Sequence, residues 1–459
     1  MQKTKLNRRE LLASAGVAAA AATFTIVPRH VIAQSGQPAP SDKINVACIG
    51  AGGQGGGDLN ACAGDKGVNV VAMADVDTQR AEGSIKRFSQ AKFYRDFRKM
   101  FDEMEKNIDA VIVGTPDHTH AVAVMAALKR KKHVYCEKPL CHSVYEAREL
   151  VKAAKEANVV TQLGNQGHSG DSIRLLCEWI WDGAIGKVQR IDLGCAAVNS
   201  AMDSLKDIKE AQKPPDSLDW DLWLGPAKER PYHKSYCPST WRGWVPFGSG
   251  TIGDWGCHVV DPVFWALDLG APKTIQAEVK DWDYKTQGDA YPKGDKVTFT
   301  FPAKGGRGEI TMVWHSGTVK IPRAEVLEAG RKGLETHWGV DTGAYVYGDK
   351  GVIIYGSHGA DGVRLIPETK MKEYKRPEPK LPRVRGGHHA DWLQAIRQGK
   401  KAGSDFSYGG PLTEIALIGV IAIKLHGTNL EWDGEKCQFT NSADANALLK
   451  ETYRTGWTL

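Results

Sequence analysis

Short apolar runs alternate with amphipathic stretches over the first third of the chain. The runs KINVACIG, VNVVAMAD, DAVIVGT, KHVYCEK and NVVTQLGN occupy residues 43–50, 68–75, 109–115, 132–138 and 158–165. Helix-patterned stretches such as HTHAVAVMAALKRKK and SVYEARELVKAAKEAN lie between them. Continuous apolar strands separated by amphipathic helices predict βαβ units and a parallel sheet that is covered on both faces.

The pattern changes at about residue 168. The later stretches GKVQRIDLGCAAV, TIQAEVKDWDY, KVTFTFPA, GEITMVWHS and AYVYGDKGVIIYG are longer, and several alternate apolar with polar residues. Such alternation is typical of an open, mostly antiparallel sheet with one covered face. Near the end, PLTEIALIGVIAIKLHG (411–427) predicts a buried helix that is too short to span a bilayer. The chain is therefore predicted to be an α/β protein with domains at 43–167 and 168–459.

The first 33 residues have the composition of an export signal. Arg8 and Arg9 precede an Ala-rich apolar stretch, and VIA offers small residues for cleavage after Ala33. The arginine pair resembles a twin-arginine signal, which would place the mature protein in the periplasm or outside the cell. An ordinary secretory leader with a chance arginine pair is the alternative. QSGQPAPSD (34–42) is predicted to be a linker.

Composition narrows the possible partners. The 459 residues are 42% hydrophobic and 25% charged, which suits two or three globular domains. The net charge of +6 lies mostly in the predicted signal, so the remainder shows no electrostatic footprint for nucleic acid or an anionic membrane. The nine cysteines include no Cys-x-x-Cys pair, so we expect mostly buried free thiols rather than a disulfide framework or zinc ribbon.

The first apolar run ends in GAGGQG, which places Gly50, Gly52 and Gly55 in G-x-G-x-x-G spacing. Between a strand and a helix, these glycines would let the backbone approach a pyrophosphate at the helix N-terminus. A purely structural glycine turn is the alternative. Asp75 ends the next strand, 20 residues beyond Gly55, where a carboxylate would bind the adenosine ribose. The Asp75 carboxylate would repel the 2′-phosphate of NADP, so it favours NAD as the cofactor. Arg80 is close enough in sequence that NADP remains the alternative.

Two further motifs carry groups suited to proton chemistry. In EKP, Glu137 and Lys138 stand at the carboxyl end of a predicted strand, and a cis Lys138–Pro139 bond is plausible. An arbitrary loop lysine would instead be solvated. In GDWGCHVVDPVFWAL (253–267), Asp254 and His258 are four residues apart at the start of an apolar helix, so they share one face. A structural Asp–His pair is the alternative.

The ordered series GAGGQG, AMADVD, GTPDHTH, EKPL and GDWGCHVVD resembles the glucose–fructose oxidoreductase / inositol dehydrogenase (Gfo/Idh/MocA) family from about residue 43 onward. The resemblance implies an N-terminal Rossmann domain and a C-terminal α/β domain that supports substrate binding and homo-oligomer contacts, as a dimer or tetramer. It implies that Lys138 is a catalytic lysine and that Asp254 and His258 are its partners at the nicotinamide.

The resemblance also implies cofactor contacts from Glu137 and from Thr115, Pro116 and His120 in TPDHTHA. Asp117 stands where asparagine is frequent in the family, so its cofactor contact is in doubt. His120 could equally pack at the start of a helix. In the implied reaction His258 takes the hydroxyl proton and Lys138 stabilises the alkoxide. Asp254 binds a neighbouring hydroxyl and orients His258.

Three other clusters are less specific. STWRGWVPFGSG (239–250) offers Trp241, Arg242 and Trp244 to a sugar ring, although a loop packed by its own tryptophans fits as well. GNQGH places Asn165, Gln166 and His168 at the end of a strand on the crevice side, and Asn165 is the one expected to bind substrate. In GGHHADW, neighbouring His388 and His389 would diverge on a helix, so packing is favoured over metal binding.

The sequence thus predicts an exported NAD(P)-dependent oxidoreductase that acts on a sugar or polyol secondary alcohol and holds its nicotinamide cofactor tightly. The alternative is an NAD-dependent glycoside hydrolase or lyase that oxidises its substrate transiently and eliminates a substituent. A non-catalytic sugar-binding protein is a third hypothesis. The combination of Lys138, Asp254 and His258 disfavours it.

Overall fold

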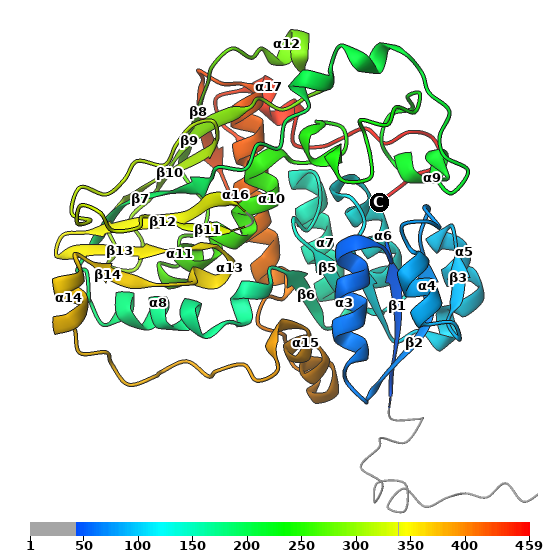
Figure 1. Ribbon diagram of the computed structural model, residues 1–459, viewed down its shortest axis with the longest axis horizontal. Helices are drawn as coiled ribbons and strands as arrows, with labels where there is room; N and C mark the ends of the chain where they lie inside the picture. The colour runs from blue at the N-terminus through cyan, green and yellow to red at the C-terminus, as the bar shows by residue number, and fades with distance from the viewer. Residues whose placement is uncertain (1–42, 338) are drawn as a thin grey trace, which may run out of the picture.

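The computed structural model describes residues 43–337 and 339–459. The predicted signal peptide and linker, with Arg8 and Arg9, lie outside these residues. Figure 1 shows two sheets side by side, the first in blue and cyan and the second in green and yellow, with helices between them.

The first sheet is parallel throughout and has the order β3-β2-β1-β4-β5-β6. Its strands are β1 (Ile44–Ile49), β2 (Val68–Ala74), β3 (Lys92–Tyr94), β4 (Ala110–Val113), β5 (His133–Glu137) and β6 (Thr161–Gly164). The order reverses between β1 and β4, which opens a crevice at the carboxyl ends of these strands. Five of the strands confirm the sequence prediction. The edge strand β3 was missed because one exposed and two half-exposed residues give no apolar run.

Helices connect these strands as the amphipathic pattern predicts. They are α3 (Gly53–Ala63), α4 (Glu82–Arg87), α5 (Phe97–Met104), α6 (Asp117–Lys129) and α7 (Val144–Ala157). Local polar residues fix where several of them begin. Asp96 accepts a hydrogen bond from the Arg98 N–H at the start of α5. Ser143 and Glu146 form a reciprocal capping box on α7.

The second sheet confirms the predicted mostly antiparallel architecture. Its order is β14-β13-β12-β7-β10-β9-β8-β15-β16, with β11 beside β12, and β7 and β10 are its parallel pair. The strands are β7 (Val188–Cys195), β8 (Thr274–Val279), β9 (Gly294–Phe301), β10 (Ile310–Gly317), β11 (Glu335–His337), β12 (Val340–Gly348), β13 (Gly351–Tyr355), β14 (Arg364–Ile366), β15 (Asn429–Asp433) and β16 (Gln438–Phe439).

The helices of this half include the one that carries the Asp–His pair. They are α8 (Asp171–Trp181), α9 (Trp220–Leu224), α10 (Gly250–Val259), α11 (Asp261–Ala266), α12 (Tyr284–Gln287), α13 (Ser357–Ala360), α14 (Glu368–Glu373), α15 (Gly387–Gln398), α16 (Phe406–Lys424) and α17 (Ala443–Ala447). The expected single helix at 253–267 is two helices, because Pro262 stands in the first turn of α11 and cannot continue α10.

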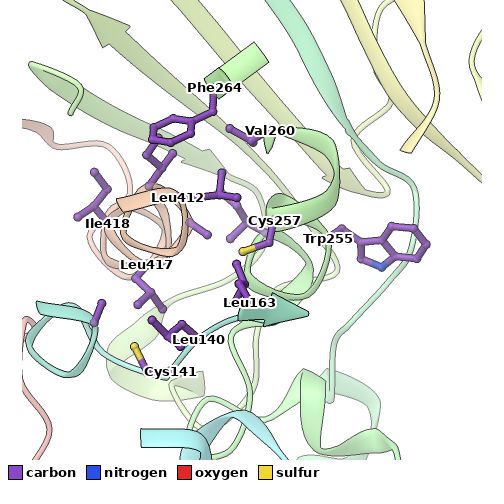
Figure 2. Close-up of a cluster of buried hydrophobic side chains, with 14 of the residues drawn as sticks. Leu140, Cys141, Leu163, Trp255, Cys257, Val260, Phe264, Leu412, Leu417 and Ile418 are labelled. Carbon is purple, nitrogen blue, oxygen red and sulfur yellow. The ribbon is translucent and has the colours of Figure 1, made fainter. Parts of the chain in front are cut away.

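Helix α16 joins the two halves. It packs against α7 and β6 of the first half and against α10, β8 and β9 of the second. Glycines permit the closest approach, since a Cβ at Gly256 would lie 3.4 Å from Ala416 Cβ and one at Gly419 only 2.7 Å from Ile252 Cδ1. Figure 2 shows Cys257 on the α16 side of α10 and Trp255 on the opposite side. One continuous core therefore positions α10 between α16 and the crevice.

Two sequence expectations concern this core. Helix α16 begins five residues before the predicted 411, and in length and composition it could cross a membrane. However, 83% of its most apolar window is buried inside the protein. All nine cysteines lie within the described residues and are free, and seven are buried, which confirms the predicted thiols.

Candidate active site

Two adjoining pockets open at the carboxyl ends of the parallel strands. The first pocket is bounded by the glycine turn after β1, Asp75 and Phe97, with segment 218–238 opposite. The second pocket contains Lys138, Asp254 and His258. Both are lined by Gly52, Arg80, Gly114, Thr115, Pro116 and Pro238. A ligand that spans both pockets would therefore run past the glycine turn.

The glycine turn is built for close backbone approach. Gly50 has φ +81°, and a Cβ there would lie 2.8 Å from Gly114 C. A Cβ at Gly55 would lie 2.0 Å from Gly50 O, so only glycine lets α3 pack against the turn. No side chain caps α3 at Gly52 in the described part of the chain. The helix N-terminus is thus available to a phosphate.

Asp75 lies at the end of β2 beside this turn. Its Oδ2 accepts a hydrogen bond from Gly52 N at 3.0 Å, and its Oδ1 accepts one from Asp77 N at 2.9 Å. Burial raises the pKa of Asp75 to about 6. These bonds fix the carboxylate in the first pocket, where it can accept from ribose hydroxyl groups. Arg80 lies next to the turn, and its guanidinium covers Gly53.

Lys138 and Asp254 form an ion pair across the second pocket. Lys138 Nζ donates to Asp254 Oδ1 at 2.6 Å and to the Asp254 carbonyl oxygen at 2.8 Å. Arg242 Nε also donates to Asp254 Oδ1, at 3.1 Å, and Asn199 Nδ2 donates to Oδ2 at 2.9 Å. The Lys138–Pro139 peptide bond is cis, as the sequence suggested.

The ion pair fixes the charge of both partners. Burial alone would raise the pKa of Asp254, but Lys138 and Arg242 overcome it and lower that pKa far below its ordinary value. Burial works against the charge of Lys138, but Asp254 outweighs it and raises the pKa. Lys138 is therefore a cation with three N–H donors. Two of them are used by Asp254, which leaves one for a substrate oxygen.

His258 lies one turn further along α10 and lines the same pocket. Its ring stacks on His358 with centroids 4.0 Å apart, and His358 in turn lies 4.4 Å from His337. Burial, with His358 and Lys138 nearby, holds the pKa of His258 well below its ordinary value. The imidazole is thus neutral and able to accept a proton.

One predicted relationship is corrected here. Asp254 was expected to orient His258, but both its oxygens are taken by Lys138, Arg242 and Asn199. The ring that contacts His258 is His358. It stands in left-handed backbone at φ 54°, where its chain passes against Gly167. Sequence reasoning missed it because it lies 100 residues away in the short, irregular α13.

The loop residues that were predicted to contact the cofactor line the second pocket. Thr115 and Pro116 line both pockets, and Thr115 Oγ1 is buried without a hydrogen-bond partner among the described residues. The ring nitrogens of His120 lie 2.7 Å from the carbonyl oxygens of Thr115 and Pro139. His120 thus ties two loops together, although it also lines the pocket. Asp117 accepts a hydrogen bond from Ser249 Oγ at 2.9 Å.

The end of β6 shows a one-residue error in the prediction. Asn165 does not line either pocket and is buried, where its Nδ2 donates to Asp261 Oδ2 at 3.1 Å. Gln166 lines the second pocket instead and donates to Glu137 Oε1 at 2.6 Å. The chain turns into a 3₁₀ helix at Gln166, so the two neighbouring side chains point apart. Asn165 is therefore not placed to bind substrate.

The structure also shows the positions and contacts of the remaining residues that the sequence analysis singled out. Trp241 and Arg242 both line the second pocket, with the guanidinium 4.3 Å from the Trp241 ring centroid. His388 Nε2 lies 2.7 Å from Leu163 O, and His389 Nε2 lies 2.9 Å from Asp58 Oδ1. These two histidines belong to packing contacts of α15. No group of three metal-binding side chains occurs in residues 43–337 and 339–459.

Comparison with protein families matches both halves of the chain. Residues 44–165 match the model described as "Oxidoreductase family, NAD-binding Rossmann fold", and residues 202–307 match "Oxidoreductase family, C-terminal alpha/beta domain". Both models describe the Gfo/Idh/MocA oxidoreductase family, so the chain is similar to this family over these two segments. The first domain thus matches an NAD-binding Rossmann fold, and the glycine turn, Asp75 and Thr115 all lie within the matched residues.

Individual Gfo/Idh/MocA relatives match over shorter lengths. Inositol 2-dehydrogenase of Rubrobacter xylanophilus is 36% identical over 32% of this chain and 42% of its own. The 2,7-anhydro-N-acetylneuraminate hydratase of Escherichia coli is 39% identical over 18% of this chain and 22% of its own. The chain therefore matches less than half the length of these curated relatives.

Solved structures show the same fold over a longer span. The inositol dehydrogenase homologue of Azotobacter vinelandii, complexed with NADH and myo-inositol, superposes with a TM-score of 0.56 at 17% identity. The superposition covers 85% of this chain and 98% of that one. The likeness shows that this chain has the same overall fold as that structure across both of its domains.

Proposed function

We propose that this protein is an NAD-dependent oxidoreductase that acts on a secondary alcohol of a sugar or polyol. The observation that carries the proposal is one pocket that holds a lysine cation, its carboxylate partner and a neutral histidine, beside the glycine turn of an NAD-binding domain. The matched relative that acts on inositol supports a polyol substrate.

His258, Lys138 and Asp254 have separate roles in the proposed proton transfer. The depressed pKa of His258 keeps its imidazole neutral, and because the ring lines the pocket it can take the proton of the substrate hydroxyl. The remaining N–H of Lys138 binds the same oxygen and stabilises its developing negative charge. Asp254 keeps Lys138 charged and in place. A bound nicotinamide would supply the hydride acceptor for the alcohol carbon, or the hydride donor in the reverse direction.

Arg242 and Trp241 form the wall of the pocket that faces the rest of the substrate. The Arg242 guanidinium uses its Nε for Asp254, so its other nitrogens remain near the opening, where the side chain is 33% exposed. A sugar has hydroxyl oxygens that accept from such nitrogens. We assign both residues to substrate binding.

We further propose export through the twin-arginine route and assembly as a homo-oligomer, a dimer or tetramer. The support for export is the Arg8–Arg9 pair before an Ala-rich stretch. This route carries folded proteins, so NAD acquired in the cytoplasm would travel with the enzyme. Replacing both arginines by lysine should retain precursor in the cytoplasm. Unchanged export of the double variant would contradict the assignment, and light scattering of the purified protein measures the assembly.

A lyase or hydrolase that oxidises its substrate transiently is the second candidate. The match to an anhydro-sugar hydratase favours it. Transient oxidation makes the neighbouring C–H acidic, a substituent then leaves, and the hydride returns to the product. The same lysine, carboxylate and histidine would serve both reactions.

One set of measurements separates these candidates. Protein as purified is denatured and the released nucleotide is identified by mass, with NAD(H) expected. Stoichiometric NADP(H) would overturn the role of Asp75. Wild-type protein is then mixed with a panel of sugars and cyclitols, and net absorbance at 340 nm supports the dehydrogenase. Release of a phenol from an aryl glycoside without net NADH supports the second candidate, and neither signal with any substrate refutes both.

A further inference from the structure

Residues 449–459, here called the strap, cross from the C-terminal half to the Rossmann domain. Figure 1 shows the strap in red leaving α17 and ending beside α6. Its first part follows α7, where Tyr145 N donates to Leu449 O at 2.9 Å. The strap thus lies beside α7 and α6, two helices that are far from it in the sequence.

Charged side chains fasten the strap at two places. Glu451 Oε1 lies 2.9 Å from Nδ1 of buried His142, just before α7. Three residues on, Arg454 donates to Gly225 O at 2.6 Å and to Asp221 Oδ1 at 2.5 Å. The second anchor joins the strap to α9, which belongs to the segment opposite Asp75 in the first pocket.

Beyond these anchors the strap reaches the first pocket itself. Trp457 lines that pocket together with Phe97, and their ring centroids are 6.2 Å apart. The Arg98 guanidinium lies 4.4 Å from the Trp457 ring centroid. Trp457 remains half-buried, so part of its ring is available to a ligand.

The rest of the first pocket identifies which part of the dinucleotide it would hold. Asp75 and the glycine turn stand at its base, and these residues bind ribose and pyrophosphate in NAD-binding domains. Leu222, Trp223 and Pro238 supply apolar surface across from them. An adenine has two flat apolar faces, and such a slot with an aromatic side chain suits it.

We propose that the strap is part of the cofactor site, with Trp457 closing the adenosine half of bound NAD and slowing its dissociation. The inference rests on the NAD-binding Rossmann domain and not on the identity of the sugar. It makes segment 218–238 and the strap a shared cover held together by Arg454. The cofactor would then leave only when this cover moves.

The test measures NADH dissociation without any sugar present. The nucleotide is removed by partial unfolding and refolding, NADH is reloaded, and its release into excess NAD⁺ is followed by fluorescence. Trp457→Ala should speed release by about 10-fold or more, because a base–aromatic contact changes affinity by roughly 5- to 150-fold. Arg454→Ala should speed it as well, since it loosens the cover without removing the ring. Trp457→Phe should release NADH at close to the wild-type rate.

The matched control is Trp181→Ala, a tryptophan on α8 that is 45% exposed and away from both pockets. It should release NADH at the wild-type rate. ADP-ribose, which lacks nicotinamide, should lose affinity for Trp457→Ala by the same factor as NADH. Equal release rates for wild type, Trp457→Ala and Trp181→Ala would overturn the role of the strap alone. Failure of wild-type protein to bind NADH would overturn the proposed function as well.

Discussion

The ammonium group of Lys138 is held by two oxygen atoms of one residue, at 2.6 Å from Asp254 Oδ1 and 2.8 Å from the Asp254 carbonyl oxygen. The two contacts place the lysine against both the side chain and the backbone of α10. The position of the proposed catalytic cation therefore depends on a helix from the other half of the protein.

Asp254→Asn should lower the pH at which activity is lost on the alkaline side. Burial lowers the pKa of Lys138, and Asp254 is the largest group that raises it, so removing the carboxylate lets the effect of burial dominate. Of the other charged groups near Lys138, Arg242 also lowers its pKa and only Glu137 still raises it, so Lys138 would lose its proton at lower pH than in the wild type. The pH dependence of single-turnover nicotinamide reduction measures the alkaline limb, which is the fall in rate at high pH.

Asn199→Ala is the matched control for that variant. It removes one hydrogen bond to Asp254 Oδ2 but leaves the carboxylate charge in place. Its alkaline limb should stay where the wild type has it. An Asp254→Asn protein with the same alkaline limb would show that the carboxylate does not control Lys138.

His258→Gln should slow hydride transfer by roughly 10²–10⁴-fold, the usual contribution of a general base. The protein should remain folded and keep its nucleotide, because His258 Nδ1 has no hydrogen-bond partner among the described residues. Stopped-flow absorbance at 340 nm gives the rate, and thermal melting gives the stability. A large loss of Tm with an unchanged single-turnover rate would assign His258 to packing alone.

His358→Asn should move the acid limb of oxidation to higher pH. His258 is faced by Lys138 and His337, which depress its pKa along with His358, and by Asp254, which raises it. Removing the stacked ring opens His258 to solvent and removes one depressing group, so its pKa rises toward the ordinary value. Protonation then disables the base at a pH where the wild type is active.

Asparagine is the suitable replacement because it tolerates the left-handed backbone of His358 better than most residues. The Tm of His358→Asn should therefore stay close to wild type. An acid limb at the wild-type pH, with the rate intact, would mean that the stacked ring has no influence on His258.

Glu451→Gln should destabilise the protein most near pH 6. Burial lowers the pKa of His142, but Glu451 overcomes this and raises it to about 9. Since the folded value lies above the unfolded value of about 6.5, this contribution is complete below about pH 6.5 and is lost as pH rises through 9. It also declines in acid, where Glu451 becomes protonated.

The expected loss in the free energy of unfolding is about 1–2 kcal/mol at pH 6, because the Glu451 carboxylate is 38% exposed and solvent weakens the pair. Chemical denaturation of the two proteins at pH 6 and pH 9.5 measures it. The difference should nearly vanish at pH 9.5. A difference that is equal at both pH values would exclude the charged pair as its cause.

The residues that sequence reasoning placed correctly stand at local signals. Gly50, Asp75 and Lys138 each follow the end of an apolar strand, and the crevice lies where such ends meet. Asp254 and His258 are four residues apart, which is about one helical turn. The sequence alone therefore predicted that their side chains face the same pocket.

The pocket residues that sequence reasoning missed reach the site through contacts between segments that are far apart in the chain. His358 reaches His258 from α13, an irregular turn whose backbone packs against Gly167. Trp457 reaches the first pocket from a segment without regular structure. Asn165 was chosen over Gln166 because the turn that separates their directions has no signal in the letters GNQGH.

The burial of α16 between the two sheets determines how the protein melts. Its apolar surface is shared by β6 and α7 on one side and by α10 and β8 on the other, so separating the halves would expose both surfaces to water. We expect one cooperative calorimetric transition for residues 43–459, and aggregation of residues 43–167 expressed alone. The crevice is therefore part of a rigid block, and ligands enter and leave through the movement of covering segments rather than by the hinging of whole domains.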